Sequence, residues 1–170
     1  AGTPPATQRR RGKIDPRREA PGRSPVMNIA TILATKGDKV VTVRPDATIR
    51  DALRLLAEHN IGALVAVDEH GRPVGILSER DVVRSASRDE RVFGRTVGEL
   101  MTRDVIVGAP RDELAAVGHT MVQRRIRHLP VIEGGRLVGM VSIGDVVKAQ
   151  RDQLEGEVDT LQTLVMEQGH

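Results

Sequence analysis

Along this chain, stretches with the apolar spacing of a helix alternate with short apolar runs typical of strands. The same succession of helix and strand patterns occurs twice. A short apolar run at 75–77 leads into Ser78, two further residues and Asp81, after which apolar residues recur at helical spacing. The second copy carries Ser142 and Asp145, each 64 positions further on. A fixed internal period of this size predicts an architecture built from two similar units.

The first copy shows alternating helical and strand patterns around this turn. The predicted elements are a short helix over 28–34 capped by Asn28, a strand over 40–43, a helix over 48–58, strands over 63–67 and 73–77 joined by a turn at 69–72, and a helix from Ser78 to about Ala86.

The second copy repeats this order after a polar link at 87–95. Its predicted elements are a short helix over 96–101, a strand over 105–107, a helix over 112–124, strands over 129–132 and 137–141 around the turn Gly134-Gly135, and a last helix from about 143 towards 168. We therefore divide the chain into a tail (1–26), a first repeat (27–90), a second repeat (91–150) and a helical extension (151–170).

The last helix carries an apolar stripe beyond the end of the second repeat. The stripe has spacings of 7, 4, 3 and 4 and is interrupted by Arg151; its members are Val147, Leu154, Val158, Leu161 and Val165. A heptad-like stripe with nothing of its own repeat to cover it predicts a contact between the helices of two copies of the chain. The alternative is an amphipathic helix that folds back on its own domain.

Composition narrows the classes of function. The chain has one Phe and no Trp or Tyr, so its core must be aliphatic. A protein with a single Phe and no Trp or Tyr lacks the aromatic stacking platforms that RNA and single-strand binders use. Hydrophobic residues make up 39% and charged residues 29%, as in ordinary globular domains.

The basic character belongs to one end of the chain. Residues 1–26 hold seven basic and two acidic side chains, whereas the remaining residues carry a net charge of −2. We interpret this Pro-, Gly- and Arg-rich tail as disordered, with contact to nucleic acid or a membrane surface as its functional alternative. No apolar run is long enough to span a bilayer, and cysteine is absent, so we expect a cytoplasmic protein.

The Ser-x-x-Asp turn allows two interpretations. Serine can accept a hydrogen bond from the third N–H of the helix while the acid reaches back, which is a capping box and needs no ligand. The same helix N-terminus can bind phosphate, and a carboxylate one turn away can accept hydrogen bonds from both ribose hydroxyls.

With these motifs the chain resembles a tandem cystathionine-β-synthase (CBS) domain pair, in particular the small stand-alone bacterial and organellar type. The resemblance covers residues 29–150, and the matching segments are 61–67, 75–81, 126–132 and 139–145. It implies an α/β (α+β) fold of two pseudo-symmetric β-α-β-β-α repeats packed through their sheets. In that family the cleft between the repeats binds adenine nucleotides, and two pairs form a disc-like dimer.

The resemblance also implies roles for individual residues. The serine contacts phosphate and the aspartate contacts ribose, and a basic pair reaches across the cleft to phosphates. Carried to this chain, these roles fall on Ser78, Asp81, Ser142, Asp145, Arg127 and His128. Adenine would lie between the aliphatic residues Ile61 and Ala63 in one site and Ile126 in the other, with backbone groups near Val41 and Val105 reading its edge.

The two copies differ in charge. Arg80 adds a cation to the first helix turn, where the second copy has Gly144. Conversely, Arg127 and His128 stand where the first copy has Gly62 and Ala63. We therefore expect two unlike sites. We assign Arg124 and Arg125 to a solvated helix end, where cations are favourable.

Catalytic signatures are missing from the chain. The five histidines have no paired ligand spacing, no glycine-rich phosphate loop is present, and no nucleophile has a positioned base, so we expect neither a metal site nor an enzyme. We predict a regulatory module that binds AMP, ATP or NAD(H), without a catalytic cofactor, and modulates a separate effector protein. The alternatives are a ligand-free interaction scaffold and nucleic-acid binding through the tail.

Overall fold

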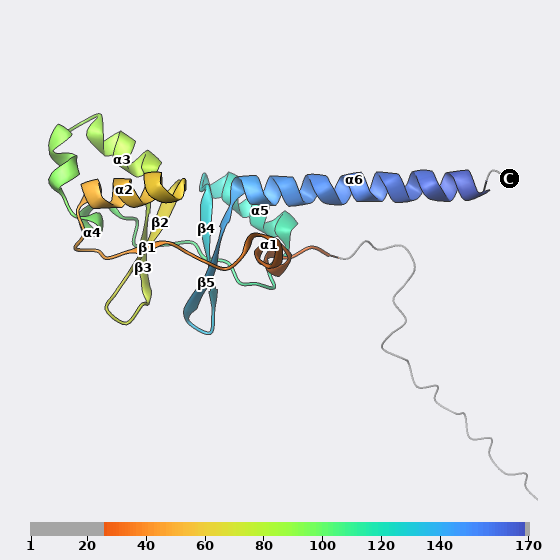
Figure 1. Cartoon of the computed structure of the whole chain (residues 1–170), viewed down its shortest axis with the longest axis horizontal. Coiled ribbons are helices and arrows are strands. Elements are labelled where there is room, and N and C mark those ends of the chain that lie inside the picture. The colour runs from red at the N-terminus through yellow and green to blue at the C-terminus, as the bar shows by residue number, and fades with distance from the viewer. Residues whose placement is uncertain (1–25, 169–170) are drawn as a thin grey trace, which may run out of the picture.

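The computed structural model describes residues 26–168. Within that range the chain forms two units of similar build that lie side by side, and one long helix that leaves the second unit (Figure 1). The basic tail predicted for 1–26 lies outside the described residues, apart from Val26.

The first unit is a three-stranded sheet with helices packed on it. Its elements are β1 (Thr42–Val43), α2 (Ile49–His59), β2 (Ala63–Val67), β3 (Pro73–Ser78) and α3 (Glu79–Ala86). β1 pairs in parallel with β2, and β2 pairs antiparallel with β3. Leu64 and Leu77 are fully buried between the sheet and the helices, which makes the aliphatic core expected from the composition.

The second unit repeats this plan with a smaller sheet. Its elements are α5 (Leu114–Arg124), β4 (His128–Glu133), β5 (Arg136–Ser142) and the start of α6 (Ile143–Gln168). β4 and β5 pair antiparallel, and their core is closed by residues such as Val131, Val141 and Val146, all fully buried.

The short opening helices are exchanged between the units. α1 (Ile29–Lys36) buries Ile29 and Ile32 in the second core, although it opens the first repeat. α4 (Val97–Leu100) buries Val97 in the first core, although it opens the second repeat. The packing units therefore cross the repeat boundaries placed at residue 90, and each unit needs a helix from the other repeat to complete its core.

Matching backbone hydrogen bonds hold the exchanged helices. The Ala30 N–H donates to the Pro110 carbonyl at 2.8 Å, and the Gly98 N–H donates to the Pro45 carbonyl at the same distance. After each helix the chain crosses back to its own unit, through residues 37–41 in the first repeat and 102–107 in the second. These two crossing segments run along the junction of the units.

Two of the predicted elements are wrong. The strand expected over 105–107 does not form; the chain meets β4 in a single parallel bridge between Gly108 and Val131. The link at 87–95, expected to be polar throughout, contains a 3-10 helix (Glu90–Gly94) whose Val92 is buried in the structure. Only two apolar residues, Val92 and Phe93, occur there, which is too few for a helical period to be recognised.

The predicted last helix is present and extends well beyond the unit (Figure 1). Its first turns pack on α5, where Gly118 lets Val146 approach closely. Beyond Arg151 the apolar stripe is exposed; Leu161, for example, is 62% accessible.

The close contact between Gly75 of β3 and the end of α4 predicts the effect of a substitution at Gly75. A Cβ at Gly75 would lie 2.5 Å from the Met101 sulfur and 3.0 Å from the Thr102 carbonyl oxygen. We expect Gly75→Ala to lower the free energy of unfolding by about 1–3 kcal/mol, because the core is overpacked. Urea unfolding measures the change.

The matched control is Gly156→Ala on the exposed part of α6, where nothing lies within 4 Å of the new Cβ. It should raise stability by up to about 1 kcal/mol through helix propensity. A Gly75→Ala protein as stable as wild type would contradict the close seating of α4 on β3.

Candidate functional site

Two cavities lie along the junction of the units, one beside each crossing segment. The first has a volume of about 630 Å³ and lies between the α3 N-terminus, residues 102–106 and residues 125–128. The second has a volume of about 330 Å³ and lies between residues 36–41, residues 60–63 and the end of β5. Both volumes fall within the range of small-molecule sites. The exchange of opening helices therefore produces two sites related by the pseudo-symmetry of the repeats.

The first cavity contains the turn that opens α3. The Ser78 N–H donates to Asp81 Oδ2 at 3.0 Å, and the Asp81 N–H donates to Ser78 Oγ at 3.3 Å. The Ser78 hydroxyl also donates to Asp81 Oδ2, at 2.6 Å. The capping box predicted from the sequence is confirmed, and both side chains also line the cavity.

The second turn has the same backbone geometry and one additional partner. The Ser142 N–H donates to Asp145 Oδ2 at 2.8 Å, and the Asp145 N–H donates to Ser142 Oγ at 3.1 Å. The Lys36 ammonium reaches the same Asp145 oxygen at 2.6 Å and also donates to the Met140 carbonyl. Burial alone would raise the pKa of Asp145, but Lys36 and the Ser142 donors hold that pKa below its usual value.

The first turn carries no such ion pair. Within the part of the chain that the structure describes, no Lys or Arg nitrogen lies within 4.0 Å of the Asp81 carboxylate. The two aspartates, 64 positions apart, thus make the same hydrogen bonds to the backbone, but only Asp145 has a cationic partner among the described residues.

Most of the residues predicted for a site line one of the cavities. The first is lined by Gly62, Ser78, Arg80, Asp81, Val105, Ile126, Arg127 and His128. The second is lined by Val41, Ile61, Gly62, Ala63, His128 and Ser142. Asp145 lines neither cavity directly; it lies behind Lys36, which lines the second.

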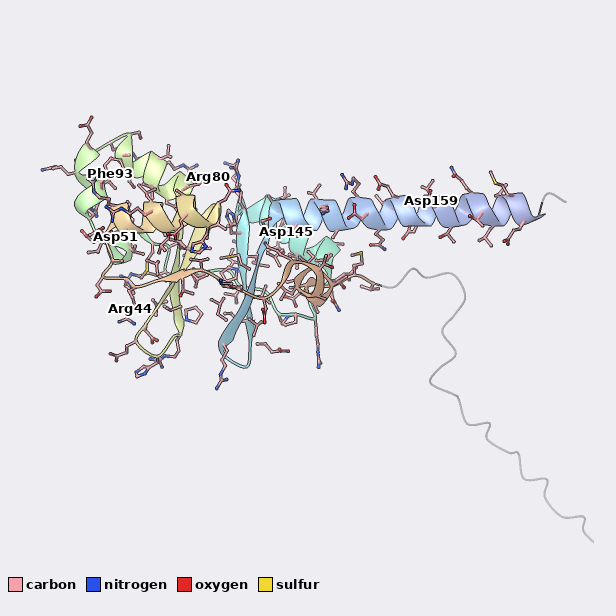
Figure 2. The ribbon with its side chains drawn as sticks, in the orientation of Figure 1. Arg44, Asp51, Arg80, Phe93, Asp145 and Asp159 are labelled. Carbon is pink, nitrogen blue, oxygen red and sulfur yellow. The ribbon has the colours of Figure 1, made fainter. Side chains whose placement is uncertain are left out.

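Arg125, which the sequence analysis assigned to a solvated helix end, lies at the first cavity. It ends α5 in a left-handed conformation (φ 54°), as Asn60 ends α2, and it lines the first cavity. Its carbonyl accepts a weak hydrogen bond of 3.4 Å from Arg80. Figure 2 shows Arg80 on the side of the first unit that faces the second. The assignment of Arg125 to a solvated helix end is therefore incomplete.

The sequence interpretation also missed several residues that line the cavities. In the first cavity these include Arg84, Thr102, Asp104 and Ile106, and in the second Lys36 and Lys39. Together with Arg80, Arg125 and Arg127, Arg84 gives the first cavity four guanidinium groups against three carboxylates. The regular spacing of Arg80 and Arg84 along one helix face was the available signal for Arg84.

His128 lies between the two cavities and lines both. A Cβ at Gly62 would lie 3.0 Å from the imidazole Cε1, so the absence of a side chain at Gly62 makes room for the ring. Burial lowers the pKa of His128, and the nearby Lys36 ammonium lowers it further, against the opposing effect of Glu79 and Asp145.

Two other classes of feature are missing from residues 26–168. No group of three or more His, Asp or Glu side chains among them could hold a metal ion. No helix in the same range is long and apolar enough to cross a membrane.

Comparison with known sequences places the chain beside one family. The family model described as CBS domain matches residues 30–88 and again residues 97–152. An uncharacterized 17.7 kDa protein of Acidianus ambivalens is 40% identical over 115 residues, which span 67% of this chain and 69% of that protein.

Solved structures give the same result for the fold. A CBS-domain containing protein from Agrobacterium tumefaciens matches with a TM-score of 0.71 at 38% identity, over 73% of this chain and 99% of that one. The CBS domain pair of protein MJ0100, crystallised with 5'-methylthioadenosine and S-adenosyl-L-methionine, matches with a TM-score of 0.68 at 28% identity, over 76% and 99% of the two chains.

The environment of His128 predicts how stability depends on pH. Well above pH 6.5 the imidazole is neutral in both folded and unfolded chains. As the pH falls through about 6.5, the unfolded chain binds the proton first, because the pKa of His128 is lowered only in the folded protein. We expect wild type to lose stability between pH 7.5 and 5.5, and His128→Gln to lose less, as measured by urea unfolding across that range.

The matched variant is His119→Gln, which removes an exposed histidine from α5. It should keep the pH dependence of wild type. Equal pH dependence in His128→Gln and wild type would contradict the lowered pKa of this half-buried imidazole.

Proposed function

The chain belongs to the CBS-domain family, as a tandem pair, and from this premise we propose that it is a regulatory module that binds an adenine nucleotide in the first cavity. The observation that carries the proposal is the first cavity itself. It combines an open carboxylate on a helix N-terminal turn, a cluster of arginines and aliphatic walls within a volume suited to a nucleotide.

Each part of such a ligand has a partner of suitable chemistry in that cavity. The Asp81 carboxylate can accept hydrogen bonds from the ribose hydroxyls, as acidic residues do in dinucleotide sites. The guanidinium groups of Arg80 and Arg127 offer donors to phosphate oxygens. The aliphatic side chains of Val105 and Ile126 offer walls for an adenine ring in a cavity that no Phe, Tyr or Trp lines.

The arginines favour phosphorylated ligands over neutral nucleosides. Four guanidinium groups meet three carboxylates around the first cavity, and an anionic ligand would balance this excess. We therefore propose AMP, ATP or NAD(H) as the ligand class. The pair crystallised with 5'-methylthioadenosine and S-adenosyl-L-methionine supports an adenosine moiety as the common element.

Regulation follows from the position of the cavity between two packing units. Such a ligand would touch α3 of the first unit and residues 125–128 of the second unit. It would therefore stabilise one relative orientation of the two units. Coupling between a ligand site and a partner surface is typically about 1–3 kcal/mol, which changes partner affinity by roughly 5- to 150-fold. The output we propose is the altered activity of an effector protein.

We propose that two copies of the chain associate through α6. Residues Val147, Leu154 and Leu161 recur every seven positions, and Val158 and Val165 complete the alternation of four and three. From Leu154 onwards, leucine occupies one seam position and valine the other, a distribution that favours two-stranded coiled coils. All five side chains are exposed in the single chain, so a second copy would remove this apolar surface from water.

A thermal-shift panel tests the nucleotide proposal. A ligand present at 100 times its Kd stabilises the fold by about 2.7 kcal/mol. For a chain of this length each kcal/mol raises Tm by about 2–4 °C. We expect AMP, ATP or NAD(H) to raise Tm by several degrees in wild type. Asp81→Asn should bind about 10-fold or more weakly, because a charge-assisted hydrogen bond is lost while the cap is kept.

The matched control is Asp104→Asn, which changes another carboxylate of the same cavity and leaves the α3 cap untouched. It should keep the nucleotide shift. The absence of any shift in nucleotide-free wild type would overturn the proposal in favour of a ligand-free scaffold. An undiminished shift in Asp81→Asn would contradict the role of Asp81.

The proposed dimer has its own test. Burying one leucine contributes about 1.5–3 kcal/mol, and the two-fold axis doubles the loss when it is replaced. We expect Leu161→Glu to weaken self-association at least tenfold, as measured by light scattering over a concentration series. Thr160→Glu introduces the same charge one residue away from the seam and should leave the mass of the assembly unchanged. A persistent dimer in Leu161→Glu would rule out α6 as the interface.

A further inference from the structure

The opening helix α1 is about one turn longer than its counterpart α4. Ile29 and Val97 make equivalent contacts at the start of their helices and are 68 positions apart. Pro45 and Pro110, which follow the crossing segments, are only 65 positions apart. The first repeat therefore contains three additional residues between these points.

Side-chain contacts show where the three residues lie. Leu33 packs against Gly139 of β5, and Met101 packs against Gly75 of β3 in the same manner. These pairs are equivalent, since Leu33 and Met101 are again 68 positions apart. The additional residues thus lie beyond Leu33, where α1 continues to Lys36 for about one more turn, whereas α4 has already ended at the equivalent position.

The last residue of the additional turn is Lys36. Its ammonium lies 2.6 Å from Asp145 Oδ2 and 3.2 Å from the Met140 carbonyl oxygen, at the edge of the second cavity. The Asp145 side chain is only 26% accessible, so the ion pair is partly shielded from water. At the equivalent place on the first unit, the backbone of Thr102 pairs with Ile76, and the described residues provide no cation within 4.0 Å of Asp81.

We propose that Lys36 occupies the carboxylate that would otherwise receive ribose in the second cavity, so that this cavity is closed to nucleotides while the first is open. The proposal builds on the proposed function, because it takes the ligand class from the first cavity. Ribose hydroxyls are neutral, and to reach Asp145 they would have to replace a full positive charge held by two hydrogen bonds. The chain therefore binds one nucleotide rather than two.

Calorimetric titration with AMP, and separately with ATP and NAD, tests the number of sites. Wild type should bind one equivalent per chain. Lys36→Met keeps the length and helical preference of the side chain but removes the charge, and it should bind a second equivalent at least roughly tenfold more tightly than wild type. Adding Asp145→Asn to Lys36→Met should abolish the second equivalent and leave the first.

The matched control is Lys39→Met. Lys39 lines the same cavity and has no ion pair with Asp145 among the described residues, so its removal should leave one equivalent. A second equivalent in both lysine variants would mean that net charge, not the contact to Asp145, closes the cavity, and would overturn the proposal.

The remaining outcomes separate this proposal from the proposed function. One equivalent in both wild type and Lys36→Met, or two in wild type, would overturn the role of Lys36 and leave the proposed function standing. Binding only in Lys36→Met, lost with Asp145→Asn, would support the role of Lys36 and overturn the first cavity as the nucleotide site. No binding in any variant would overturn both.

A measurement without ligand checks the contact itself. The carboxyl carbon of Asp145 can be titrated by NMR in wild type and in Lys36→Met. The pKa of Asp145 should rise in the variant, because the Lys36 ammonium helps to hold it low. An unchanged pKa would show that the ion pair does not form in solution and would overturn the proposal.

Discussion

The exchange of opening helices is the constraint on which the rest of this structure depends. Each unit buries apolar side chains of the other repeat's first helix, Ile29 in one direction and Val97 in the other. A small sheet with two helices leaves apolar surface uncovered, and the exchanged helix closes it. The chain must then cross the junction twice, and each crossing segment forms one wall of a cavity. The core and the candidate sites therefore have a common origin.

The Ser-x-x-Asp turns show how one local structure serves stability and recognition together. The cap is complete without a ligand, because Ser78 and Asp81 satisfy each other's backbone groups. A cap of this kind contributes about 0.5–2 kcal/mol and holds the carboxylate in a defined place. For this reason a change at Asp81 can be interpreted as a loss of ligand contact only when the replacement keeps the cap, as Asn does.

Local patterns in the sequence were sufficient to predict the two repeats, the hairpins, both capping turns and the long last helix. The helix at 90–94 was missed because its apolar pattern is too short, whereas the misses at 105–107 and at Lys36 depend on contacts between segments far apart in the chain. Nothing near 105–107 shows that its neighbour β4 accepts only one bridge, at Gly108. Likewise, the helix pattern around 28–34 cannot show that the next turn places Lys36 against a carboxylate 109 residues away.

The exchange also explains how the two halves of a duplicated chain can come to differ in their sites. The additional turn of the opening helix in the first repeat changes the cavity built on the turn of the second repeat, because α1 packs on that unit. The first repeat keeps its own turn unaltered, since its cavity is bordered by the segment that follows the shorter α4. A single short insertion is therefore enough to make one site unlike the other without disturbing either core. Differences between the sites of such a pair are best sought in the helix of the opposite repeat, where a comparison of the two Ser-x-x-Asp motifs alone would not reveal them.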